Sequence, residues 1–80
     1  MSALRKTKIV ATIGPATKSI EALMDIMNAG VDVCRVNCSH CNAQEIRSNV
    51  ANIRRAAATL GRSVSILLDF HENLTFYVNN

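Results

Sequence analysis

The residues best suited to chemistry lie close together near the middle of the chain. Arg35, Asn37, Ser39 and His40 follow one another at the end of a short apolar segment. Because side chains alternate along a strand, Arg35, Asn37 and Ser39 should share one side of it. A guanidinium suits phosphate, whereas the oxygens of Asn37 and Ser39, with the Asp69 carboxylate, suit a hard cation. The sequence therefore predicts a polar cluster that binds an anion and a cation, or else a set of side chains that cap the loop backbone.

Three cysteines overlap this cluster. Cys34, Cys38 and Cys41 have the spacing C-x3-C-x2-C, which occurs in iron-sulfur enzymes, and His40 or His71 could complete a zinc site. On an extended strand, however, the sulfurs of Cys34 and Cys38 lie roughly 13 Å apart, which is too far for one compact cluster. Either metal site would therefore need a looped conformation.

Length and composition limit the remaining options. A chain of 80 residues with 49% hydrophobic and 4% aromatic residues suits one soluble α/β domain or part of one. The net charge of +3 is too small to indicate nucleic-acid binding. No apolar run approaches the roughly 20 residues that span a bilayer, and residues 1–8 are too polar for a signal peptide. We therefore expect a cytoplasmic chain with neither nucleic-acid nor membrane partners.

The first half of the chain predicts one strand and one helix. Residues 8–13 are apolar and β-branched and end at Gly14-Pro15, which favours a strand buried on both faces. Apolar residues then recur with helical spacing from Ile20, after Ser19 as N-cap and before Gly30 as the stop. The methionines of this helix, Met24 and Met27, should fill the core.

A second strand and helix follow. Residues 31–38 are rich in β-branched side chains and come directly after a helix stop, which favours a strand. Asn42 and Glu45 resemble a capping box, and the apolar stripe behind them continues to Gly61. The opposite side of this helix should be solvated, and it carries Arg47, Arg54 and Arg55.

A third strand completes the pattern. Residues 64–68 form another apolar run, which ends on Asp69, and residues 74–78 suggest a further extended segment. The resulting β-α-β-α-β order, with short connections, predicts an α/β fold with a parallel sheet. Because ligands bind beyond the carboxyl ends of parallel strands, the polar cluster occupies the expected place for a site.

Four segments resemble, in the same order, the start of pyruvate kinase. They are TKIVATIGP at residues 7–15, AGV at 29–31, CRVNCSH at 34–40 and LLD at 67–69. The resemblance covers about residues 5–71. It implies that residues 1–71 are the N-terminal portion of a (β/α)8 TIM barrel, incomplete in this chain, and that residues 72–80 are a divergent tail.

The resemblance also implies an activity and its ligands. Pyruvate kinase is a glycolytic transferase that moves a phosphoryl group from phosphoenolpyruvate to ADP, giving pyruvate and ATP, with Mg²⁺ and usually K⁺. By position, Arg35 resembles the arginine that binds the substrate phosphate. Asn37, Ser39, Asp69 and the backbone carbonyl of Phe70 resemble the K⁺ ligands.

The nucleotide contacts carry over to the segment after the second strand. By resemblance, ADP or ATP is bordered by Asn37, Cys38, Ser39 and His40. The chain departs from the family here, because Cys38 replaces the usual Phe and Cys41 replaces the usual Gly. Both changes add a thiol beside the predicted site.

The family's catalytic lysine and Mg²⁺-binding carboxylates come from later strands, so these 80 residues alone are expected to be inactive. Family members are homo-oligomers, usually tetramers. The alternative is a non-catalytic fragment that uses its open sheet edge as an interaction module.

Overall fold

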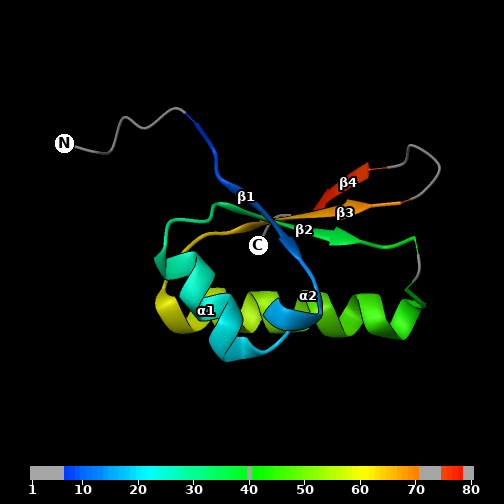
Figure 1. The fold of residues 1–80 in the computed structure, drawn as a ribbon, viewed down its shortest axis with the longest axis horizontal. Coiled ribbons are helices and arrows are strands. Elements are labelled where there is room, and N and C mark those ends of the chain that lie inside the picture. Colours follow the sequence, from blue (N-terminus) through cyan, green and yellow to red (C-terminus); the bar gives the residue numbers. More distant parts are fainter. Residues whose placement is uncertain (1–6, 40, 71–74, 79–80) are drawn as a thin grey trace.

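The computed structural model describes residues 7–39 and 41–70, together with the backbone of 75–78. Four strands and two α-helices follow one another along the chain (Figure 1). In order, the elements are β1 (Val10–Ile13), the short 3-10 helix η2 (Pro15–Thr17), α1 (Ile20–Asn28), β2 (Val33–Asn37), α2 (Ala43–Leu60), β3 (Ser65–Asp69) and β4 (Thr75–Val78).

The strands form one sheet in sequence order, β1-β2-β3-β4. β1, β2 and β3 are parallel, whereas β4 is antiparallel to β3. Both helices lie on the same side of the sheet (Figure 1). The predicted parallel β-α-β-α-β unit is therefore confirmed, and the extended segment predicted at 74–78 is found as β4.

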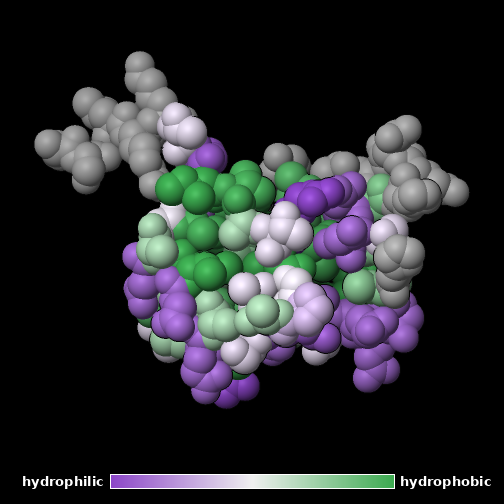
Figure 2. Space-filling model, viewed as in Figure 1, coloured by the Kyte–Doolittle hydropathy of each residue, from purple (hydrophilic) through white to green (hydrophobic). Residues whose placement is uncertain are grey.

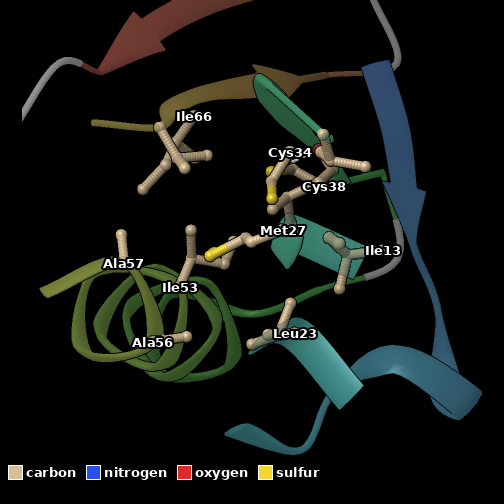
Figure 3. Close-up of a cluster of buried hydrophobic side chains, with 12 residues drawn as sticks. Ile13, Leu23, Met27, Cys34, Cys38, Ile53, Ala56, Ala57 and Ile66 are labelled. Carbon is tan, nitrogen blue, oxygen red and sulfur yellow. Dashed lines mark hydrogen bonds between the residues drawn. The ribbon is translucent and has the colours of Figure 1, made fainter. Parts of the chain in front are cut away.

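The core lies between the helices and one face of the sheet. Helix residues Leu23, Met27 and Ile53 pack there with Ile66 of β3 (Figure 3). Met27 is fully buried and Met24 packs against the cluster, which confirms that both methionines fill the core. In Figure 2, hydrophobic residues gather along the sheet and hydrophilic ones on the outer side of the helices. Arg47, Arg54 and Arg55 are exposed, as predicted.

The prediction that the first strand is buried on both faces is wrong. Val10 is 52% exposed and the preceding Ile9 is 41% exposed. Only Ile13 of β1 is buried among the four residues of the strand. The reason is topological: β1 is the first strand of the sheet order, and both helices cover the same face. A continuous apolar run does not distinguish this arrangement from a central strand.

Local signals fix where the helices begin and end. Ser19 Oγ accepts a hydrogen bond from Ala22 N at 3.1 Å at the start of α1. At the start of α2, Asn42 Oδ1 accepts from Glu45 N at 2.8 Å, and Glu45 Oε1 accepts from Asn42 N at 3.0 Å. Gly61 ends α2 with a φ of 65°, a left-handed conformation that glycine adopts without strain. These predicted caps are confirmed.

Asn42→Ala should lower the free energy of unfolding by about 1 kcal/mol, because the Glu45 amide loses its acceptor. Urea denaturation monitored by circular dichroism measures this change. Asn42→Ser, which keeps a capping oxygen, should restore most of the lost stability. Equal midpoints for Asn42→Ala and the unmodified chain would contradict the assigned cap.

In the part of the chain that the structure describes, neither helix has the length and apolar character needed to cross a membrane.

Candidate functional site

The carboxyl ends of β2 and β3 lie side by side. Asn37, the last residue of β2, is aligned with Asp69, the last residue of β3. Immediately beyond, Cys38 N donates a hydrogen bond to the Asp69 carbonyl oxygen at 2.8 Å. The structure therefore brings together two predicted site residues that are far apart in the sequence.

Arg35 forms an ion pair with Asp69 across this edge. Its Nε donates to Asp69 Oδ2 at 2.9 Å, and its Nη2 donates to the same oxygen. The Arg35 side chain remains 39% exposed. A guanidinium has five N–H donors, so hydrogen atoms remain for a further acceptor after these contacts. Two residues predicted to bind separate ligands thus also bind each other.

Thr12 is a member of the site that the sequence analysis missed. Its Oγ1 lies 3.5 Å from Arg35 Nη1, at the long limit of a hydrogen bond. β1 and β2 pair so that Thr12 is aligned with Arg35. One feature of the sequence could have indicated Thr12, because it is the polar residue in an otherwise apolar strand. Recognising it required the register between two strands.

Asn37 and Ser39 form a compact turn after β2. Asn37 Oδ1 accepts from Ser39 N at 3.1 Å and from Ser39 Oγ at 2.7 Å. These are loop-capping bonds of the kind that the alternative interpretation predicted. They also hold the two side-chain oxygens together at the strand end.

Side-chain oxygens from β2, from the turn after it and from β3 lie at this edge. Asn37 Oδ1 and Ser39 Oγ are adjacent, and Asp69 belongs to the neighbouring strand. Both Arg35 bonds go to Asp69 Oδ2, so the other carboxylate oxygen, Oδ1, is not the one engaged by the guanidinium. Phe70 follows Asp69 directly in the sequence. Oxygen ligands of this kind are those that hard cations select.

A cavity of about 430 Å³ opens next to the turn. One wall comes from the segment after β1, and another from the start of α2. It is lined by Ile13, Gly14, Pro15, Lys18, Val36, Asn37, Cys41, Glu45, Ser48 and Asn49. A volume of this size accommodates a small-molecule ligand. His40, predicted beside the nucleotide, lies outside the described residues.

The three cysteines do not come together as metal ligands in the part of the chain that the structure describes. Cys34 and Cys38 lie among the buried side chains (Figure 3). Burial raises the pKa of the Cys34 thiol to about 11. Burial also raises the pKa of Cys38, with a smaller contribution from Cys41. Within residues 7–39 and 41–70, no three histidine, cysteine or acidic side chains form a group able to hold a metal. Neither the iron-sulfur nor the zinc alternative finds its ligands there.

Known proteins resemble this chain over most of its length. The family described as "Pyruvate kinase, barrel domain" matches residues 4–73. Pyruvate kinase of Geobacillus stearothermophilus is 54% identical over 65 residues, which cover 81% of this chain and 11% of the relative. Pyruvate kinase of Bacillus licheniformis is 52% identical over 66 residues, 82% of this chain and 11% of the relative.

A solved structure supports the same relationship. The crystal structure of a pyruvate kinase from Cryptosporidium parvum aligns with a TM-score of 0.76 and 37% identity, over 80% of this chain and 13% of that one. The chain thus spans about a tenth of the length of the curated relatives (11%). The sequence identity, the shared fold and the matched barrel domain lead to one conclusion: the chain belongs to the pyruvate kinase family and carries the first part of its barrel domain.

Proposed function

We propose that this chain supplies substrate-phosphate, K⁺ and nucleotide contacts for phosphoryl transfer from phosphoenolpyruvate to ADP, in a cytoplasmic enzyme of glycolysis. The observation that carries this proposal is the partly exposed Arg35 guanidinium, paired with Asp69 at the carboxyl ends of two parallel strands. Ligands of barrels and open α/β sheets bind at such an edge. Residues 1–71 would be the barrel segment and 72–80 a divergent tail.

Arg35 is the proposed phosphate ligand. Asp69 and Thr12 hold its guanidinium from two sides, so its orientation is set before a substrate arrives. Phosphoryl transfer depends mainly on positioning and on stabilising negative charge, so an oriented guanidinium lowers the barrier in both ways. The charge of Asp69 also partly balances that of Arg35 before a phosphate binds.

Asn37, Ser39, Asp69 and the Phe70 carbonyl are the proposed K⁺ ligands. Bound there, K⁺ would add positive charge beside the transferring group. Asp69 would then serve two purposes, orienting Arg35 with Oδ2 and holding the cation with Oδ1. Mg²⁺, which the family resemblance also implies, takes no ligand from these residues. The 80 residues alone are therefore proposed to bind rather than to catalyse.

The cavity beside Asn37 is the proposed nucleotide pocket. Asn37 lines it directly, and Ser39 is hydrogen-bonded to Asn37. Cys38 is only 4% exposed, so its contribution would come from the backbone rather than from its thiol. His40, proposed to contact the nucleotide, lies outside the described residues. Homo-oligomeric assembly stays a prediction.

Asp69→Ala tests the proposed cation site. The assay uses a chimera in which residues 4–73 replace the matching segment of the Geobacillus stearothermophilus enzyme. Asp69→Ala should abolish most of the K⁺ activation and raise the KM for phosphoenolpyruvate, because a cation ligand and the Arg35 partner are lost together. Initial rates over a series of K⁺ concentrations measure the effect.

Asp25→Ala is the matched control, since Asp25 is an exposed aspartate on α1, away from the proposed ligands. It should leave the K⁺ response as in the unmodified chimera. An unchanged K⁺ response in Asp69→Ala would remove Asp69 from the cation site.

A second candidate function is a non-catalytic interaction module. Val10, the first residue of the edge strand β1, and Ile9 just before it are exposed, and a further strand or apolar surface could pack there. Co-purification with a complete pyruvate kinase tests this function. A well-folded, strictly monomeric chain that retains no partner would count against it.

A further inference from the structure

The loop between β2 and α2 carries two cysteines whose thiols have no part in the proposed function. Cys38 and Cys41 have the spacing C-x2-C, between the last residue of β2 and the N-cap of α2. Both thiols are free in this structure. They also stand where the resemblance to pyruvate kinase leads us to expect Phe and Gly, so the family's function does not account for the pair.

The backbone turn brings the two cysteines close together. Cys41 N donates a hydrogen bond to the Cys38 carbonyl oxygen at 3.3 Å. A bond of this i to i+3 type closes a turn in which the two Cα atoms lie within about 7 Å of each other. Disulfides join Cα atoms that are about 4.4 to 6.8 Å apart. The turn therefore holds Cys38 and Cys41 near the range that a disulfide requires.

Each of the two sulfurs makes only a weak hydrogen bond to a backbone carbonyl. Cys38 Sγ donates to the Val36 carbonyl oxygen at 3.4 Å, and Cys41 Sγ donates to the Asn37 carbonyl oxygen at 3.4 Å. Thiols are weak donors, so losing either of these hydrogen bonds costs little. Cys34 differs, because an extended strand separates it from Cys38 by roughly 13 Å. The fold therefore selects one pair among the three cysteines.

Access to the two thiols is unequal. Cys41 is partly exposed and lines the cavity of about 430 Å³, whereas Cys38 is buried and does not line it. A small oxidant entering the cavity would meet Cys41 first. Cys38 is then placed to react with the modified Cys41. This order, an accessible thiol followed by a resolving one, is typical of redox-sensing cysteines.

We propose that Cys38 and Cys41 are a redox site that reacts with small disulfides of the glutathione class to form an intrachain disulfide. Cys41 sulfur attacks one sulfur of the small disulfide, loses its proton to solvent and releases one small thiolate, which takes a proton from solvent. Cys38 sulfur then attacks Cys41 sulfur in the mixed disulfide, loses its proton and displaces the second small thiol in the same way. Two protein thiols are oxidised, and one small disulfide is reduced to two thiols.

Oxidation would alter the site described above. The disulfide replaces the thiol contacts to the carbonyls of Val36 and Asn37, next to the turn that holds Ser39. Cys41 also lies in the cavity wall, so the shape of the cavity changes. The oxidised protein should bind ADP more weakly than the reduced protein. This consequence rests on the proposed function, whereas formation of the disulfide does not.

Incubation of the purified protein with oxidised glutathione tests the redox site. After alkylation and peptide mapping by mass spectrometry, two of the three thiols should be lost to a Cys38–Cys41 crosslink that dithiothreitol reverses. Retention of all three thiols would overturn the proposal. So would a stable glutathione adduct on Cys41 with Cys38 still free, or a crosslink only between copies of the chain.

Two variants and one condition show whether the fold selects the pair. Cys34→Ala should still form the crosslink, whereas Cys41→Gly should leave Cys38 open to alkylation. In denaturant, crosslinks to Cys34 should appear as well. If the native and the denatured protein gave the same distribution of crosslinks, the turn would not be what selects the Cys38–Cys41 pair.

Calorimetry with ADP, before and after oxidation, separates this inference from the proposed function. ADP should bind more weakly after oxidation, and dithiothreitol should restore the original affinity. In Cys41→Gly, oxidation should leave ADP affinity unchanged. This set of results supports both the redox site and the nucleotide pocket. A crosslink that forms in a protein whose reduced state does not bind ADP supports the redox site and refutes the nucleotide pocket.

Discussion

Arg35→Ala should lower kcat/KM for phosphoenolpyruvate by on the order of 10³-fold, the scale that one arginine contributes to phosphoryl transfer. The substitution removes the guanidinium that Asp69 and Thr12 orient at the strand ends. An ion pair this exposed contributes at most about 1 kcal/mol to stability, so the lost activity should not come from unfolding. Steady-state kinetics of the Geobacillus stearothermophilus chimera, with a thermal melt beside it, measure both effects.

Two further variants make the result specific. Arg35→Lys keeps the charge but loses the planar fork of donors, so it should recover only part of the rate. Arg54→Ala removes an exposed arginine from α2, and it should leave kcat/KM unchanged. Near-normal turnover of Arg35→Ala would exclude Arg35 from phosphate binding.

Ile66→Ala should destabilise the fold far more than loss of the Asn42 cap. Ile66 is 0% exposed on β3 and packs in the cluster between sheet and helices (Figure 3). Truncating such a side chain costs about 2–5 kcal/mol, against a total of about 5–15 kcal/mol for a domain. In a chain of this size the midpoint of thermal unfolding should fall by on the order of 10 °C or more.

Ile9→Ala is the matched control, because it removes the same atoms from an exposed position. It should change the free energy of unfolding by no more than about 0.5 kcal/mol. Circular dichroism melts of the two variants and the unmodified chain give the comparison. Similar midpoints for the two variants would contradict the packing assigned to Ile66.

The parts of the fold that depend on neighbouring residues could be predicted from the sequence. The caps at Ser19 and Asn42 and the stop at Gly61 involve residues within a few positions of one another. The separation of Arg35 from the buried Cys34 and Val36 also follows from simple alternation along one strand. Such patterns are visible in a single segment.

The parts that depend on strand placement could not be predicted in the same way. The Arg35–Asp69 pair joins residues 34 positions apart, and the contact of Arg35 with Thr12 spans 23 positions. Both require the register of β2 with its neighbours, which no single segment encodes. The exposure of Val10 has the same origin, since the sequence of β1 does not reveal which faces the helices cover.

The order of strands in the sheet also bears on how the chain acquires its structure during synthesis. Each strand pairs with the one before it in the sequence, so every pairing becomes available as soon as the next strand has left the ribosome. The two parallel pairings nevertheless join residues 23 and 32 positions apart, and contacts of such separation form more slowly than the contacts within each helix. Arg35 and its strand neighbour Thr12 are both translated before Asp69. These two residues can therefore come together before Asp69 joins the site.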